Sequence, residues 1–86
     1  MNNGKTEDHI RSVAIQVLGD IAPEADLEAL DPDVAFADQL DFDSVNCLNF
    51  VLGMGRELQI TIPETDCHRL STLNGCVDYL APKLSR

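Results

Sequence analysis

The chain has 86 residues, of which 15 are acidic and 6 are basic, so its formal net charge is −9. That excess of acid disfavours binding to nucleic acids or anionic membranes, because both depend on Lys and Arg side chains that meet phosphates. No apolar run reaches membrane-spanning length, and the first residues are polar rather than signal-like. We therefore expect a single small domain that is cytoplasmic, monomeric and not inserted in a membrane.

Helical periods dominate the chain, and the alternation typical of strands is almost absent. The first helix is predicted to begin with Thr6 as its N-cap and to end near residue 20, ahead of Pro23. Its core-facing residues are Ile10, Val13, Ala14, Val17, Leu18 and Ile21.

The segment from residue 22 to residue 43 has no helical period and is rich in acidic residues. A connection of this length in a compact domain has to be packed down or functional. We expect a short turn over residues 36–40 and four apolar anchors on the core, which are Leu27, Leu30, Phe36 and Leu40.

A second helix is predicted over residues 44–58, and it carries two apolar lines. The first has the spacing of a core-facing stripe and consists of Cys47, Phe50, Val51, Met54 and Leu58. The second line is Val45, Leu48 and Leu52. Either this helix is central and surrounded on most sides, or the second line is a docking surface for other proteins.

Two glycines in this helix, Gly53 and Gly55, each cost about 1 kcal/mol relative to alanine. They indicate either fraying after Leu52, which we favour, or slack that lets an internal cavity open.

Pro63 suits the first turn of a short third helix that extends to about Arg69. A fourth helix should follow Ser71 or Thr72, with Pro82 fraying or breaking its last turn. Its stripe consists of Leu73, Val77, Leu80 and Leu84. The expected fold is all-α, a four-helix bundle of three main helices and one short one, with a long loop between the first two. We expect a flexible N-terminus over residues 1–5, the folded domain over 6–82 and a tail over 83–86.

The three cysteines, Cys47, Cys67 and Cys76, are odd in number and occupy apolar-patterned positions. We therefore expect buried free thiols rather than redox or metal-binding groups. Cys67 and His68 are adjacent, but no second ligand pair completes a zinc set, so no metal site is predicted.

Ser44, in the stretch QLDFDSVN, has several possible roles. Asp43 or Ser44 can cap the helix. A serine nucleophile is disfavoured, because there is no nucleophile elbow and no basic partner. A calcium loop also fails, because glycine and the final carboxylate are missing from their positions. The remaining role of Ser44 is covalent modification, since a phosphodiester at the start of a helix faces unpaired N–H groups.

These residues resemble the acyl carrier protein family. Asp43-Ser44-Val45, preceded by Leu40-Asp41-Phe42, is similar to its phosphopantetheine attachment motif. The short loop from Leu58 to Pro63, the entry Leu70-Ser71-Thr72-Leu73 and the ending Val77-Asp78-Tyr79-Leu80 resemble the rest of the family pattern. The resemblance covers roughly residues 6–81.

The resemblance implies a carrier rather than an enzyme, with 4'-phosphopantetheine attached covalently to Ser44 by a phosphopantetheinyl transferase. The arm would hold acyl groups as thioesters and deliver them to loading, elongating or transferring enzymes of fatty-acid, lipid or polyketide-like synthesis. The residues implied to contact partners are Val45, Leu48, Asn49, Leu52 and Arg56. Those implied to line a pocket for the acyl chain are Cys47, Phe50, Val51, Met54, Ile62 and Leu70.

The second helix departs from the family pattern in its charge. Asn46 and Asn49 stand where fatty-acid carriers have acidic residues, and Gly55 and Arg56 replace further acids. An apolar, amide-rich face depends less on charge steering, which favours a dedicated pathway over general fatty-acid synthesis. The alternative function is an aminoacyl, peptidyl or D-alanyl carrier that is loaded by an adenylating enzyme.

Overall fold

The computed structural model describes residues 3–40 and 42–84, which form helices and connections without any strand. The three long helices are α1 (Asn3–Ile21), α3 (Ser44–Leu58) and α4 (Leu73–Leu84). The short ones are the 3-10 helix η1 (Leu27–Ala29), α2 (Phe36–Gln39) and the 3-10 helix η2 (Glu64–Leu70). The expected all-α bundle of three main helices and one short helix, with a long first connection, is confirmed.

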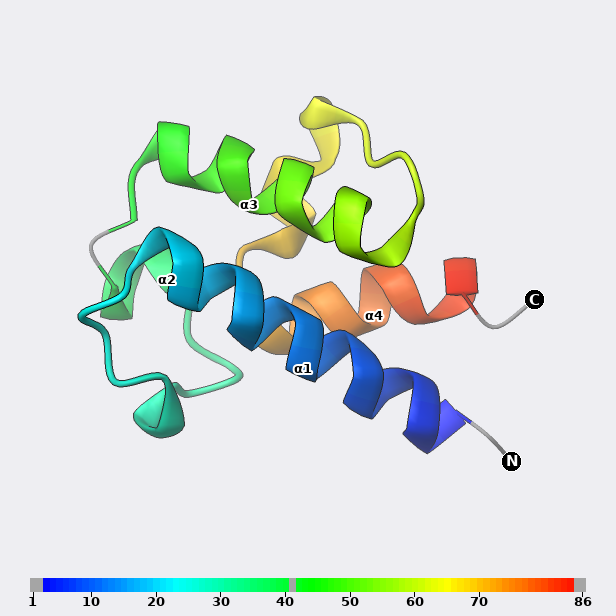
Figure 1. Cartoon of the computed structure of the whole chain (residues 1–86), viewed down its shortest axis with the longest axis horizontal. Coiled ribbons are helices and arrows are strands. Elements are labelled where there is room, and N and C mark those ends of the chain that lie inside the picture. Colours follow the sequence, from blue (N-terminus) through cyan, green and yellow to red (C-terminus); the bar gives the residue numbers. More distant parts are fainter. Residues whose placement is uncertain (1–2, 41, 85–86) are drawn as a thin grey trace.

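Helix α1 packs against both α3 and α4, and η2 bridges α3 and α4 (Figure 1). In that view α1 runs opposite to α3 and α4, so the start of α3 lies at the other end of the molecule from the start of α1. The core fills the space between the helices. Its fully buried large side chains are Ile10, Leu18, Phe36, Phe50, Val51, Met54, Leu70, Cys76 and Leu80.

The first helix begins earlier than predicted, and the last helix ends later. Helix α1 begins at Asn3 rather than after a cap at Thr6, because a single glycine, Gly4, weakens a helix without breaking it. Helix α4 continues through Pro82 to Leu84. Pro82 removes only one hydrogen bond in the exposed last turn, where water can satisfy the carbonyl that loses its donor. The expectations for residues 1–2 and 85–86 lie outside the described residues.

The long connection is held on the core mainly by Phe36, which is fully buried. Its ring lies 5.6 Å from that of Phe42 and 5.3 Å from that of Phe50, measured between centroids. Its backbone N–H donates to the carbonyl of Ser71 at 2.8 Å, which ties the connection to the entry of α4. The other three predicted anchors are half-buried against the core, as expected, and they are Leu27, Leu30 and Leu40.

The two glycines of α3 do not mark fraying, so that prediction was wrong: the helix continues to Leu58. A Cβ atom on Gly53 would lie 2.7 Å from Cγ1 of Val17 in α1, so glycine lets the two helices approach closely. A Cβ atom on Gly55 would lie 2.8 Å from the carbonyl oxygen of Ile60. The chain turns back over Gly55 after Gln59, which has the left-handed φ of 59°.

Replacing Gly55 with alanine is expected to lower the free energy of unfolding by about 1–3 kcal/mol, because the new methyl group must displace backbone. Gly19→Ala in α1 is the matched control, since its Cβ would make an ordinary 3.5 Å contact with Leu27. That variant should be neutral or more stable by up to about 1 kcal/mol, from helix propensity alone. Urea denaturation of both variants measures the difference, and equal stabilities would contradict the close approach at Gly55.

Candidate functional site at the start of helix α3

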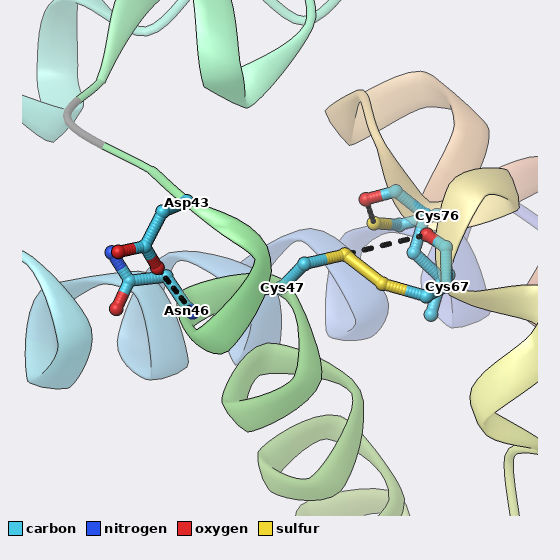
Figure 2. Close-up of a disulfide and its surroundings, with 6 residues drawn as sticks. Asp43, Asn46, Cys47, Cys67 and Cys76 are labelled. Atoms are coloured by element: carbon cyan, nitrogen blue, oxygen red, sulfur yellow. Dashed lines mark hydrogen bonds between the residues drawn. A yellow bond between two sulfur atoms is a disulfide. The ribbon is translucent and has the colours of Figure 1, made fainter.

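Ser44 is the first residue of α3, and its side chain is exposed. The cap of the helix is Asp43, whose Oδ1 accepts the backbone N–H of Asn46 at 2.9 Å (Figure 2). The sequence left the choice of cap open between these two residues. Because Asp43 performs this role, the Ser44 hydroxyl can project from the first turn of the helix to an external reagent.

Asp43 therefore contributes to stability through its carboxylate oxygen. Asp43→Ala should lower the free energy of unfolding by about 1 kcal/mol, the usual cost of a lost cap. Asp43→Asn is the matched control, because an amide oxygen caps a helix as well as a carboxylate oxygen does. Its loss in the free energy of unfolding should be only a few tenths of the loss in Asp43→Ala. Chemical denaturation followed by circular dichroism checks both, and equal losses in the two variants would show that charge rather than capping is the cause.

A hollow of about 390 Å³ lies beside Ser44, where the end of the long connection, the first turn of α3 and η2 meet. Its lining is mostly small or apolar and consists of Ala35, Ala37, Phe42, Asp43, Ser44, Cys47, Cys67, His68 and Ser71. That residues of η2 would lie here could not be predicted from the sequence, because only tertiary packing brings them to the start of α3. The sequence shows that Cys67 and His68 are adjacent, but it does not show which residues they contact in the fold.

Cys47 and Cys67 are joined by a disulfide across the hollow (Figure 2). The expectation that they are buried free thiols was wrong, since both are half-buried and their Cα atoms lie 6.5 Å apart. This separation is within the range that a disulfide spans. The 20-residue spacing conceals the pair in the sequence, because it reflects the packing of η2 on α3.

Cys76 matches the expectation of a buried free thiol. Burial raises the pKa of its thiol to about 12, so almost none of it is thiolate at neutral pH. Its Sγ lies 3.6 Å from the carbonyl oxygen of Leu70, which accepts its weak hydrogen bond. Cys76 is therefore a packing residue and a poor nucleophile.

The residues expected to line an acyl-chain pocket lie in two places. Cys47 lines the hollow beside Ser44. The other five are packed into the core, at 0–7% exposure, and they are Phe50, Val51, Met54, Ile62 and Leu70.

The second apolar line of α3 faces outward, so the interpretation of α3 as a helix surrounded on most sides was wrong. Val45 is 63% exposed and Leu52 is 51% exposed, while Leu48 is half-buried. Asn49 and Arg56 are also exposed on this helix. These five residues, at Val45, Leu48, Asn49, Leu52 and Arg56, form one outward strip that begins next to Ser44.

Little of the protein's acidic charge lies on this strip. Helix α3 carries only Arg56 and Glu57 as charged residues. The connection before it carries exposed acids, which are Glu24, Asp26, Glu28, Asp31, Asp33, Asp38 and Asp43. A partner that meets α3 would therefore contact apolar and amide side chains, with Arg56 and Glu57 as the charged residues of the helix.

The comparison with protein families gives one match, to the model described as phosphopantetheine attachment site, over residues 8–80. This match spans most of the chain and agrees with the helical bundle and with an exposed serine at the start of α3. The protein therefore belongs to the phosphopantetheine-binding family of carrier domains. No solved structure matches the chain. Across residues 3–40 and 42–84, no helix has both the length and the apolar character to span a bilayer.

The cofactor of this family is 4'-phosphopantetheine, which is attached covalently and supplies a thiol at the end of a flexible arm. The start of α3 fits this group on two grounds. The Ser44 side chain is exposed, and the first N–H groups of α3 favour a phosphodiester. The hollow beside it offers a mostly apolar surface on which the arm can rest.

Proposed function

We propose that Ser44 carries the phosphopantetheine arm and that the protein is an acyl carrier protein. In this role it holds acyl groups as thioesters and delivers them to enzymes of fatty-acid, lipid or polyketide-like synthesis. The observation that carries the proposal is the exposed hydroxyl at the first residue of α3, immediately after a cap made by its neighbour Asp43. Tethering raises the effective concentration of the cargo at each partner's active site, so the carrier itself needs no catalytic group.

The preference for acyl over aminoacyl cargo comes from the chemistry around Ser44. The hollow is lined by Ala35, Ala37 and Phe42, and it contains no acidic side chain apart from the capping Asp43. An aminoacyl group bears an ammonium, for which such a lining offers little stabilisation. An uncharged acyl chain loses less hydration free energy when it contacts this lining.

The outward strip on α3 is proposed to contact the phosphopantetheinyl transferase and the enzymes that load, extend or transfer the cargo. Its exposed Val45 and Leu52 supply apolar area next to the attachment site. With few charges on the strip, binding should depend on shape and apolar contact more than on steering, which suits a dedicated set of cytoplasmic partners.

The test uses the purified chain with coenzyme A and a transferase of broad specificity. Intact-mass spectrometry should show the gain of one phosphopantetheine, and peptide mapping should place it on Ser44. The modified protein is then offered to an acyl-loading enzyme and to an adenylating enzyme with amino acids. Loading by the first alone supports an acyl carrier, loading by the second alone supports an aminoacyl carrier, and an unmodified chain would refute both.

A further inference from the structure

The disulfide beside Ser44 has features that a purely structural crosslink does not need. Both of its residues are half-buried and line the hollow, so the hollow is the side from which a small thiol would approach them. The third cysteine, Cys76, is fully buried and has a raised pKa, so it does not compete in thiol exchange. The pair can therefore open and close without scrambling.

The crosslink also lies on one particular seam of the bundle, between α3 and η2. Helix η2 packs against both α3 and α4, and its polar side-chain contacts with these helices lie on the α4 side: the carboxylate of Asp66 accepts from the Tyr79 hydroxyl, and Arg69 lies over the Tyr79 ring at 5.9 Å. The carbonyl of Leu70 accepts from Cys76 of α4. Among the described residues, the Cys47–Cys67 disulfide is the covalent bond that joins η2 to α3. Breaking it removes the covalent restraint toward α3 and leaves η2 held there by apolar packing alone, while the polar contacts with α4 remain.

A backbone carbonyl beside the disulfide can accept a hydrogen bond from the Cys47 thiol after reduction. The Sγ atom of Cys47 lies 3.8 Å from the carbonyl oxygen of Cys67. A sulfur in a disulfide has no proton to donate, so this contact is a hydrogen bond only when Cys47 is a free thiol. The carbonyl of Cys67 is therefore an acceptor close to Cys47 once the pair is reduced and the two sulfur atoms have moved apart.

We propose that Cys47 and Cys67 form a reversible redox latch that fixes η2 against α3 and closes the seam beside Ser44. Closing it takes two electrons from the thiols: each loses its proton, the Cys47–Cys67 bond forms, and a low-molecular-weight disulfide such as oxidised glutathione leaves as two thiols. Opening is the reverse, in which a thiolate attacks one sulfur and a second thiol resolves the mixed disulfide. In reducing compartments, disulfides usually have such transient, redox-sensing roles.

The consequence for cargo rests on the proposed function of Ser44. The apolar side chains behind the seam, among them Phe50, Met54 and Leu70, are closely packed. The route from the hollow beside Ser44 to these side chains parts η2 from α3. The oxidised latch therefore keeps the cargo outside the bundle, and the reduced latch permits it to enter.

The first experiment uses the unmodified chain in buffers of graded reduced-to-oxidised glutathione ratio. Alkylation under denaturing conditions, followed by intact-mass spectrometry, should count one free thiol at the oxidising end and all three at the reducing end. Cys76→Ala should keep the transition, and Cys47→Ser should abolish it. Three free thiols at every ratio, or a bond that involves Cys76, would overturn the latch.

The second experiment measures amide hydrogen exchange of η2 in the oxidised and reduced chains. We expect exchange over residues 64–70 to be roughly tenfold faster in the reduced chain, since local opening is no longer restrained by the crosslink. The amides of α1 far from the seam serve as the internal reference. Equal rates in η2 would show a disulfide that does not hold the seam, and the proposal would fail.

The third experiment loads Ser44 with a pantetheine arm that carries an octanoyl group through an amide, which reductants do not cleave. The methyl NMR shifts of Val51, Met54 and Leu70 should change on loading in the reduced protein and remain nearly constant in the oxidised protein. Identical changes in both states would overturn the control of cargo. If Ser44 cannot be loaded, the proposed function fails, whereas the first two experiments still decide whether the latch exists.

Discussion

Ser44→Ala should abolish the transferase-dependent mass gain completely while leaving the protein folded. The hydroxyl is the only atom group removed, and a methyl group cannot attack or accept a phosphoryl group. Stability should change by no more than about 0.5 kcal/mol, because Ser44 is exposed and the cap of α3 is made by Asp43. Intact-mass spectrometry measures the modification, and a thermal melt measures the fold.

The control for this variant is Ser71→Ala. Ser71 is also exposed and lines the same hollow, and its interaction with Phe36 uses the backbone carbonyl, which the substitution retains. Its modification should equal that of the wild type. A mass gain that persists in Ser44→Ala, or that disappears in Ser71→Ala, would move the attachment site away from the start of α3.

Phe36→Ala should have the largest effect on stability, a loss of about 3–5 kcal/mol in the free energy of unfolding. Phe36 has no exposed surface and lies against the rings of Phe42 and Phe50. A small domain has only about 5–15 kcal/mol of stability in total, so the variant should be partly unfolded near physiological temperature. The whole ring is lost from a site where the surrounding helices cannot close the cavity.

Phe36→Leu separates the effect of volume from the effect of simple apolar character. It retains most of the buried volume and should lose about 1–2 kcal/mol. Guanidinium denaturation monitored by circular dichroism gives both values. A loss below about 1 kcal/mol for Phe36→Ala would mean that the connection before Ser44 is not held by this ring.

The predictions that failed concern features whose cause lies outside their own segment. Gly55 resembles a helix breaker locally, yet its role is to admit the carbonyl of Ile60, which returns from a turn after the helix. Cys47 resembles one more core residue of α3, yet its partner Cys67 comes from a segment whose position depends on the packing of η2. Periodicity describes one helix at a time and contains no information on such approaches.

The helices, their apolar faces and the serine at the start of the second long helix followed from the sequence by itself. These features depend on the 3.6-residue period, on capping and on proline, all of which act over a few neighbouring residues. The tertiary structure alone decided that Val45 and Leu52 face outward, that two glycines of α3 make room for neighbouring segments, and that two cysteines meet beside Ser44. The physical reason is that burial and bonding between distant segments depend on how the helices pack, which no local pattern determines.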